Sequence, residues 1–541
     1  MKTYLKYAAA ATLMLALTGC VQNLNTEPID PNIVQTFQQD EVYYKIYAGL
    51  GTSGQKGPDG DCDIVANNEG YSVFYRLVFV HNEFPADGGW WIWGDAGVPD
   101  LLECKWTSEN AFVSLLYNRL NFNVTTCNHF LENTEGMTDE KTVRQRAEIR
   151  FMRALNFYYL MDFFGNPPFS LAVTSKNPTQ IEGGRPALYQ WLVDELLAAE
   201  NDLEEKTSTY RVSKDAARVL LARLYLNAEV YTDGAVKAYD KAEEYAKKVM
   251  DKYELADKYA ELFMGDNDTN GAAKEIIFAI PQDGNMVQSW GGSSCMVAMT
   301  RSNGSMDDYG SDVAWECWRS SPSLVSVFTD SPDSHHANEF NMPAEVGDDR
   351  ALLSNVRYVM SSGDKPVRLK DANGNDSVNY NAVECTGPAA YGTGNFTKCW
   401  SICKWTGIYS TGTSGKHEKF VDTDVPFIRA AEAYMTYAEA LYRQGNPTEA
   451  LNIINTKIRA RAHAAALPSI DDDVLLDEWQ REFYAEARRR IDLIRFGQFA
   501  GPKATRTWEG HKAGIDKKYN LYALPNSDCV ANPNLKQNEG F

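Results

Sequence analysis

The stretch that decides the fold begins at Ala430, ends at Leu451 and reads AAEAYMTYAEALYRQGNPTEAL. Small residues alternate with large ones on both sides of Gly445-Asn446-Pro447. Small residues at these places let two antiparallel helices approach closely, as in a tetratricopeptide-like hairpin of about 34 residues. Residues 217–226 and 240–243 repeat the pattern more loosely. The stretch therefore predicts stacked helical hairpins, with general helix packing as the alternative.

Helical periodicity continues on both sides of this stretch. It predicts helices over residues 111–131, 139–164, 188–203, 214–231, 239–250, 427–443, 448–463 and 473–496. Residues from about 265 to 425 are instead rich in Gly, Ser, Asn and Asp, which predicts loops with short strands and helices. We therefore expect a mostly α fold in a single domain of residues 20–541. Its helical scaffold covers about 35–260 and 425–500, its irregular insertion about 265–425, and its irregular tail 500–541.

Composition and charge limit the class of protein. Of the 541 residues, 44% are hydrophobic and 23% are charged, which is typical of a globular chain rather than a disordered one. The 53 Lys and Arg against 73 Asp and Glu give a net charge of −20. An acidic surface repels a phosphate backbone or an anionic lipid, which argues against either as the main partner.

The first twenty residues have the pattern of a leader sequence. Lys2 and Lys6 precede an apolar run from Tyr7 to Ala16, and Leu17-Thr18-Gly19-Cys20 follows it. This run is too short to span a bilayer, so we expect residues 1–19 to be a cleaved signal. A small residue before Cys20 is typical of bacterial lipoproteins, in which the thiol is acylated; ordinary cleavage beside an incidental cysteine is the alternative.

Catalytic motifs are missing from the sequence. It contains no HExxH zinc motif and no GxSxG nucleophile elbow. Nine cysteines besides Cys20 are an odd number, which does not favour a disulfide framework. Paired carboxylates for glycoside hydrolysis stay possible among the 73 acidic residues.

Several segments, in this order along the chain, resemble the SusD family of outer-membrane lipoproteins. They are Arg146–Leu155 (RAEIRFMRAL), Phe164–Pro168 (FGNPP), Glu275–Phe278 (EIIF), Arg429–Tyr434 (RAAEAY), Asp492–Arg495 (DLIR) and Leu524–Phe541 (LPNSDCVANPNLKQNEGF). Ala487 departs from the pattern, because the family usually has Gly there. The resemblance implies a tetratricopeptide-like scaffold that carries a glycan-binding face. It also implies binding of oligosaccharide outside the cell, without catalysis, above a SusC-like TonB-dependent transporter.

Other segments, such as Gly54–Gly57 (GQKG) and Gly347–Leu353 (GDDRALL), resemble the starch-binding branch of this family. That likeness implies α-glucan as the ligand and an arc of aromatic side chains that follows the curved chain. The implied glycan-binding residues are Asn68, Arg76, Trp91, Trp290 and Trp315. An indole suits this role, because it packs on the C–H face of a pyranose while polar groups meet the hydroxyl rim. Ala96 departs from an Asn of the branch, which bears on α-1,4-glucan specificity.

The resemblance further implies a structural calcium ion. Its ligands would be Asp268, Asn270, Asp422 and Asp424, whose hard oxygen atoms suit Ca²⁺; a solvated acidic loop is the alternative. Two other functions stay open. A surface glycoside hydrolase would need two carboxylates at the aromatic arc, and a purely structural transporter lid would bind no sugar by itself.

Overall fold

The computed structural model describes residues 36–66, 68–173, 177–205, 207–301, 306–329, 346–354, 358–360, 366–368, 400–508, 511 and 514–541. The predicted signal and Cys20 lie outside the described residues. Residues 43–541 form one compact unit. Among the described helices, none combines the length and the apolar character needed to cross a membrane.

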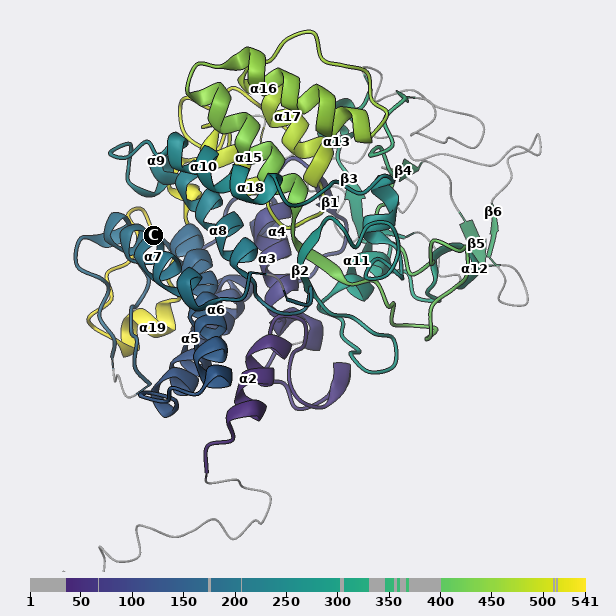
Figure 1. Ribbon diagram of the computed structural model, residues 1–541. Coiled ribbons are helices and arrows are strands. Elements are labelled where there is room, and N and C mark those ends of the chain that lie inside the picture. The colour runs from purple at the N-terminus through teal and green to yellow at the C-terminus, as the bar shows by residue number, and fades with distance from the viewer. Residues whose placement is uncertain are drawn as a thin grey trace, which may run out of the picture. The chain divides into compact units, whose positions relative to one another are not determined.

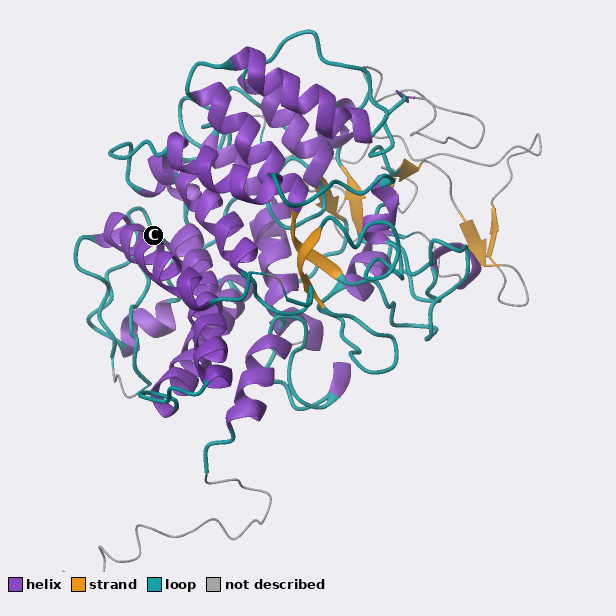
Figure 2. Ribbon diagram, viewed as in Figure 1, coloured by secondary structure: helices purple, strands orange, loops and turns teal. Residues whose placement is uncertain are grey.

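Helices are the predominant regular structure, as the periodicity predicted (Figures 1 and 2). The first set is α2 (Gln39–Ala48), α3 (Phe74–Glu83), α4 (Val98–Leu102), α5 (Ala111–Asn133), α6 (Glu140–Phe164), α7 (Gly184–Asp202), α8 (Lys214–Leu226), α9 (Ala228–Tyr231) and α10 (Tyr239–Met250). The second set is α11 (Ser293–Thr300), α12 (Met306–Tyr309), α13 (Pro322–Ser326), α15 (Ala430–Arg443), α16 (Pro447–Ile453), α17 (Asp472–Phe483), α18 (Arg489–Arg495) and α19 (Asn526–Ala531).

The scaffold helices pack in succession. Helix α5 packs on α6, α6 on α7, α7 on α8, α8 on α10, α10 on α15, and α15 on α16. The contact between α10 and α15 joins segments that are separated by the whole insertion (Figure 1). The two predicted parts of the scaffold therefore form one continuous stack, consistent with helical hairpins.

Local signals explain where the best-predicted helices begin and end. The Asp139 carboxylate accepts a hydrogen bond from the Thr142 amide at 3.0 Å and caps α6. Gly165 follows the helix with φ of +70°, a conformation that favours glycine. At α5, the Asn110 side chain accepts from the amides of Phe112 and Val113. These caps set the bounds within two residues of the prediction.

The long final helix, predicted over residues 473–496, was wrong. Helix α17 ends at Phe483 and α18 begins at Arg489. Between them, Ala485 and Ala487 have φ of +57° and +61°, in the left-handed region that a helix excludes. The Trp405 indole donates to the Ala485 carbonyl at 3.1 Å, and the Asn82 amide donates to the Ala487 carbonyl at 2.9 Å. Tertiary hydrogen bonds therefore hold the break.

The strands are short and lie beside the loop-rich part of the molecule (Figure 2). They are β1 (Gly89–Trp91), β2 (Ile276–Ile280), β3 (Trp318–Ser320), β4 (Leu353–Ser354), β5 (Tyr358–Met360), β6 (Pro366–Arg368), β7 (Ser401–Ile402) and β8 (Val425–Arg429). They pair antiparallel as β1–β3, β2–β8, β4–β7 and β5–β6. Because β2 and β8 pair, both ends of the insertion leave the scaffold at one place. Residues 427–429, predicted as helix, belong to β8.

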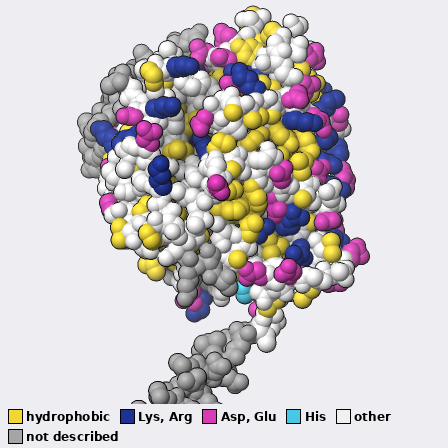
Figure 3. Space-filling model, turned by 90° about the vertical axis from the view of Figure 1, so that its left-hand side faces the viewer, with side chains coloured by type: hydrophobic (Ala, Val, Ile, Leu, Met, Phe, Trp, Pro, Cys, Tyr) yellow, Lys and Arg dark blue, Asp and Glu magenta, His cyan; other side chains and the backbone are white. Residues whose placement is uncertain are grey.

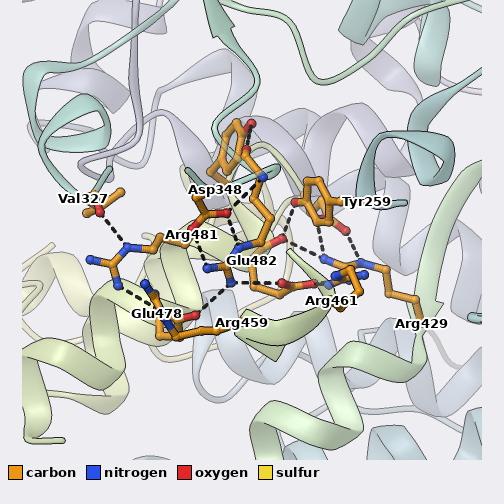
Figure 4. Close-up of polar contacts among 12 residues, drawn as sticks. Tyr259, Val327, Asp348, Arg429, Arg459, Arg461, Glu478, Arg481 and Glu482 are labelled. Carbon is orange, nitrogen blue, oxygen red and sulfur yellow. Dashed lines mark hydrogen bonds and ion pairs between the residues drawn. The ribbon is translucent and has the colours of Figure 1, made fainter. Parts of the chain in front are cut away.

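A buried ionic network anchors the insertion on α17 (Figure 4). Arg350 belongs to the insertion and pairs with Asp348 at 2.8 Å and with Glu478, on α17, at 2.9 Å. Arg459 also pairs with Glu478, and Arg429 pairs with Glu482 at 2.7 Å. Burial by itself would raise the pKa of Glu478. The neighbouring Arg350, Arg481 and Arg459 outweigh burial and lower this pKa to about 2. The network stays ionised at neutral pH and fixes the insertion on the scaffold.

One face of the molecule carries charges of both signs, intermixed with hydrophobic side chains (Figure 3). Neither sign forms a continuous block in this view. On this face, charged side chains of both signs are therefore interspersed rather than gathered into a patch of one sign.

Candidate functional site

Two indoles from the insertion pack against each other. Trp290 lies in the loop between β2 and α11, and Trp315 lies in the loop before β3. Their ring centroids are 5.1 Å apart with an angle of 43° between the rings. Phe420 also packs against Trp290, with the two ring centroids 4.7 Å apart. Both indoles are partly exposed, so each keeps surface for a ligand.

Arg76 contacts both members of this pair. Its Nη1 donates to the carbonyl of Trp290 at 3.0 Å, and its guanidinium lies 4.2 Å from the Tyr71 ring and 5.7 Å from the Trp315 ring. Only 4% of Arg76 is exposed. Gly70 permits this close packing, because a Cβ there would lie 2.3 Å from Arg76 Nη1. Arg76 therefore positions the aromatic pair, and its guanidinium does not form an open polar rim.

Trp91 is the buried indole of the predicted set. It lies on β1 opposite Trp318, is 2% exposed, and packs 5.2 Å from Phe84. Its Nε1 donates to Asp95 at 2.7 Å. The indole face is thus covered by protein, whereas Trp93, 5.8 Å away, is partly exposed. Between these two indoles, Trp93 is the one with surface open to a sugar.

Asn68 and Asp95 complete the cluster. The Asn68 side chain is exposed, accepts from the Gly70 amide at 3.1 Å and caps the short helical turn Glu69–Ser72. The Asp95 carboxylate, which accepts from Trp91, also accepts a hydrogen bond from the Tyr71 hydroxyl at 3.4 Å. A chain of contacts therefore connects all five predicted residues, but Trp290, Trp315 and Asn68 are the ones that reach the surface.

Trp290 also lines an open surface depression of about 670 Å³. This volume falls in the range of small-ligand sites, about 300–1,000 Å³. Three segments of the chain line it. The lining residues are Lys56, Pro58, Gly60, Gln288, Trp290, His417, Glu418, Lys419 and Phe420. The depression thus combines aromatic surface with hydrogen-bonding side chains, which is the composition that sugar recognition needs.

Sequence reasoning missed the loop of His417 to Phe420. A lone histidine in a Gly- and Ser-rich segment carries no motif, so its place beside Trp290 follows only from the fold. The loop of Lys56 to Gly60 overlaps a segment that marked the family resemblance, but no role could be read from it. Glu418 is the only carboxylate among the described lining residues of the depression.

The predicted calcium ligands are brought together only in part. Asp268 and Asp424 both accept from the Tyr210 hydroxyl, at 3.3 and 2.8 Å. The Asn270 side-chain oxygen accepts from the Ala272 amide at 2.8 Å instead. Among the residues that the structure describes, no three His, Cys, Asp or Glu side chains are grouped as a metal site would require. The four-ligand arrangement is therefore not assembled.

The environment of Asp424 nonetheless suits a cation. Burial is the main effect that raises its pKa to about 7, and the nearby carboxylates of Asp268 and Asp422 add to it. The hydrogen bonds from Gln282 and Tyr210 lower this pKa in part. Asp422 itself accepts from the amides of Gly284 and Lys416 at 2.9 Å and from the Tyr409 hydroxyl at 2.8 Å. Asp268 and Asp424 are thus the two residues that could hold an ion, while Asp422 secures a loop.

The chain matches known proteins over its whole length. A family model described as "SusD family" matches residues 274–541, and one described as "Starch-binding associating with outer membrane" matches residues 87–226. The chain is 38% identical to the starch-binding protein SusD of Bacteroides thetaiotaomicron, over 100% of both chains.

Solved structures show the same fold. A SusD superfamily protein from Parabacteroides distasonis superposes with a TM-score of 0.66 at 17% identity, covering 94% of this chain and 100% of the other. Surface glycan-binding protein A from Bacteroides uniformis gives a TM-score of 0.64 at 17% identity, covering 92% and 98%. The full-length identity to a curated member shows that this chain belongs to the SusD family.

Proposed function

We propose that this protein binds an oligosaccharide at the outer surface of the outer membrane, with α-glucan as the favoured ligand. The observation that carries the proposal is the pair Trp290–Trp315, partly exposed and held by Arg76 beside an open depression. Indole faces pack on sugar C–H groups, and the neighbouring polar side chains suit the hydroxyl rim. The starch-binding relative, which is 38% identical, supports the same class of ligand.

The proposed cellular role is delivery of the bound glycan to a SusC-like TonB-dependent transporter. Acylation of Cys20 would attach the protein to the outer membrane, with the glycan site facing outward. This part of the proposal rests on family membership and on the leader sequence. A site that hands its ligand onward must release it readily, so we expect dissociation constants from micromolar to millimolar, about −8 to −4 kcal/mol.

The rival function is a surface glycoside hydrolase. Hydrolysis by the common mechanisms requires two carboxyl groups about 5–10 Å apart around the glycosidic bond. The described lining of the depression offers Glu418 alone. Binding without catalysis is therefore the function that this geometry supports better.

Calorimetry of a soluble form of the protein, residues 21–541 without the acylated Cys20, tests the proposal. The ligands are maltooligosaccharides of increasing length, with fructans and β-glucans as comparisons. Saturable binding of maltooligosaccharides is expected, with no reducing ends released after long incubation. Binding of a fructan or β-glucan alone would overturn the α-glucan assignment, and new reducing ends would favour the hydrolase. Absence of heat with every glycan would favour a structural lid.

A further inference from the structure

His417 lines the depression together with Trp290 and Phe420. Its Nδ1 accepts hydrogen bonds from two backbone amides, Lys419 at 3.0 Å and Phe420 at 3.3 Å. The imidazole ring packs 5.3 Å from the Phe420 ring. A neutral imidazole has one acceptor nitrogen and one donor nitrogen. Because the backbone occupies Nδ1 as the acceptor, the proton resides on Nε2, which becomes a donor.

The loop that carries His417 is held firmly. The Asp422 carboxylate, 7% exposed, accepts from the Lys416 amide on this loop and from the Gly284 amide across from it, both at 2.9 Å. Gly284 also permits close approach, because a Cβ there would lie 2.6 Å from the Phe420 carbonyl oxygen and 2.9 Å from the His417 Cβ. The donor is therefore placed before any ligand arrives, which lowers the entropic cost of binding.

We propose that His417 is a specificity-determining residue, whose Nε2–H donates to a hydroxyl oxygen of a sugar ring seated in the depression against Trp290. Pyranose hydroxyls project from the rim of the ring, whereas an indole covers its face. A donor that lines the same depression as the indole is suited to meet that rim. Arg76 cannot supply this bond as it stands, because its guanidinium is buried beneath the aromatic pair. The inference rests on the proposed glycan-binding function.

His417→Asn separates the two roles of this side chain. Asparagine can place its side-chain oxygen where Nδ1 lies and accept the same backbone amides, as in an Asx turn. It has no group at the position of Nε2. We expect an unchanged melting temperature and a loss of affinity of about 3–10-fold for maltoheptaose, the effect of one net hydrogen bond. His463→Asn is the matched control, since His463 is 73% exposed and pairs with Asp349 outside the depression.

Calorimetry with wild type, His417→Asn and His463→Asn distinguishes the outcomes. The inference is supported if the wild type and His463→Asn bind maltoheptaose equally well and His417→Asn binds it more weakly. Equal binding by all three overturns the inference and leaves the proposed function standing. Absence of wild-type binding to every glycan of the panel overturns both.

A second measurement does not depend on the variant folding. The ¹⁵N chemical shifts of the His417 ring in the wild-type protein are expected to show a protonated Nε2 and an unprotonated Nδ1. A proton on Nδ1 in the neutral ring would overturn the inference, because that nitrogen would then not accept from the Lys419 amide.

Discussion

Trp290→Ala is expected to weaken glycan binding without unfolding the protein. The substitution removes the indole that lines the depression, together with its ring contacts to Trp315 and Phe420. The hydrogen bond from Arg76 is kept, because it goes to the backbone carbonyl of residue 290. The loop should therefore stay in place while the stacking surface is lost.

The magnitude follows from the weight of aromatic anchors in binding sites. Truncating one such anchor costs about 1–3 kcal/mol of binding free energy, which corresponds to about 5–150-fold in the dissociation constant. Wild-type constants of about 1 µM to 1 mM would therefore become constants of about 5 µM to 150 mM in the variant. Trp315→Ala should weaken binding in the same direction, because Trp315 supports the ring of Trp290.

Trp191→Ala is the matched control. Trp191 is a partly exposed indole on α7 that packs 5.2 Å from Phe157 and 5.0 Å from Phe169, and it does not line the depression. Calorimetry measures binding of maltoheptaose, and circular dichroism confirms the helical fold of each variant. Wild-type affinity in both Trp290→Ala and Trp315→Ala would show that the site has been placed wrongly.

Four further predictions concern stability and location. Ala487→Gly should raise the free energy of unfolding, measured in urea, by about 1 kcal/mol, because glycine accepts the φ of +61° without strain. A free energy of unfolding below that of the wild type would contradict this prediction. Burial raises the pKa of Glu83 to about 7, although the hydrogen bonds from the backbone amides of Arg488 and Arg489 lower it in part. Between the ordinary pKa of 4.5 and about 7, the folded state therefore keeps a proton on Glu83 that the unfolded state has released. Stability should consequently fall as pH rises from about 5 to 8, by on the order of 1–3 kcal/mol, and Glu83→Gln should flatten that slope in thermal melts; an unchanged slope would refute the assignment. EDTA should lower the melting temperature by a few degrees if Asp268 and Asp424 hold calcium in solution, and identical melts with and without EDTA would remove them as ligands. Cys20→Ala should move the protein from the membrane fraction to the soluble fraction, since acylation would supply the anchor; a variant that still sediments with membranes lacking the transporter would contradict the lipoprotein prediction.

Much of the scaffold could be predicted because its signals are local. The α10 bounds, Tyr239–Met250, agree with the periodicity at both ends. Helices α5 and α6 begin at polar caps that can be read from the sequence, Asn110 and Asp139. Their apolar faces also extend over many turns, which makes the helical period easy to recognise.

The errors occurred where distant contacts override local preference. Apolar periodicity continues through residues 484–488, yet Trp405 and Asn82 bind the carbonyls of Ala485 and Ala487 in a non-helical turn. Alanine there gives no sign of a break, whereas the glycine usual in the family would have. Likewise, pairing with β2 converts residues 427–429 into a strand.

The fold brings the predicted indoles of the candidate site close to one another but does not expose all of them. Trp290 and Trp315 lie together at the surface, but pairing of β1 with β3 buries Trp91 opposite Trp318. Sequence spacing does not reveal which indole of Trp91 and Trp93 faces solvent. The role of His417 depends on two backbone amides and a depression formed by separate loops, so no sequence signal could indicate it.

The most direct test of the central claim is a crystal structure of the mature protein with the glycan that binds best in calorimetry. We predict a sugar ring packed on Trp290 in the depression, with one hydroxyl oxygen within hydrogen-bonding distance of His417 Nε2. A glycan bound at another surface, with the Trp290–Trp315 pair left bare, would contradict the account.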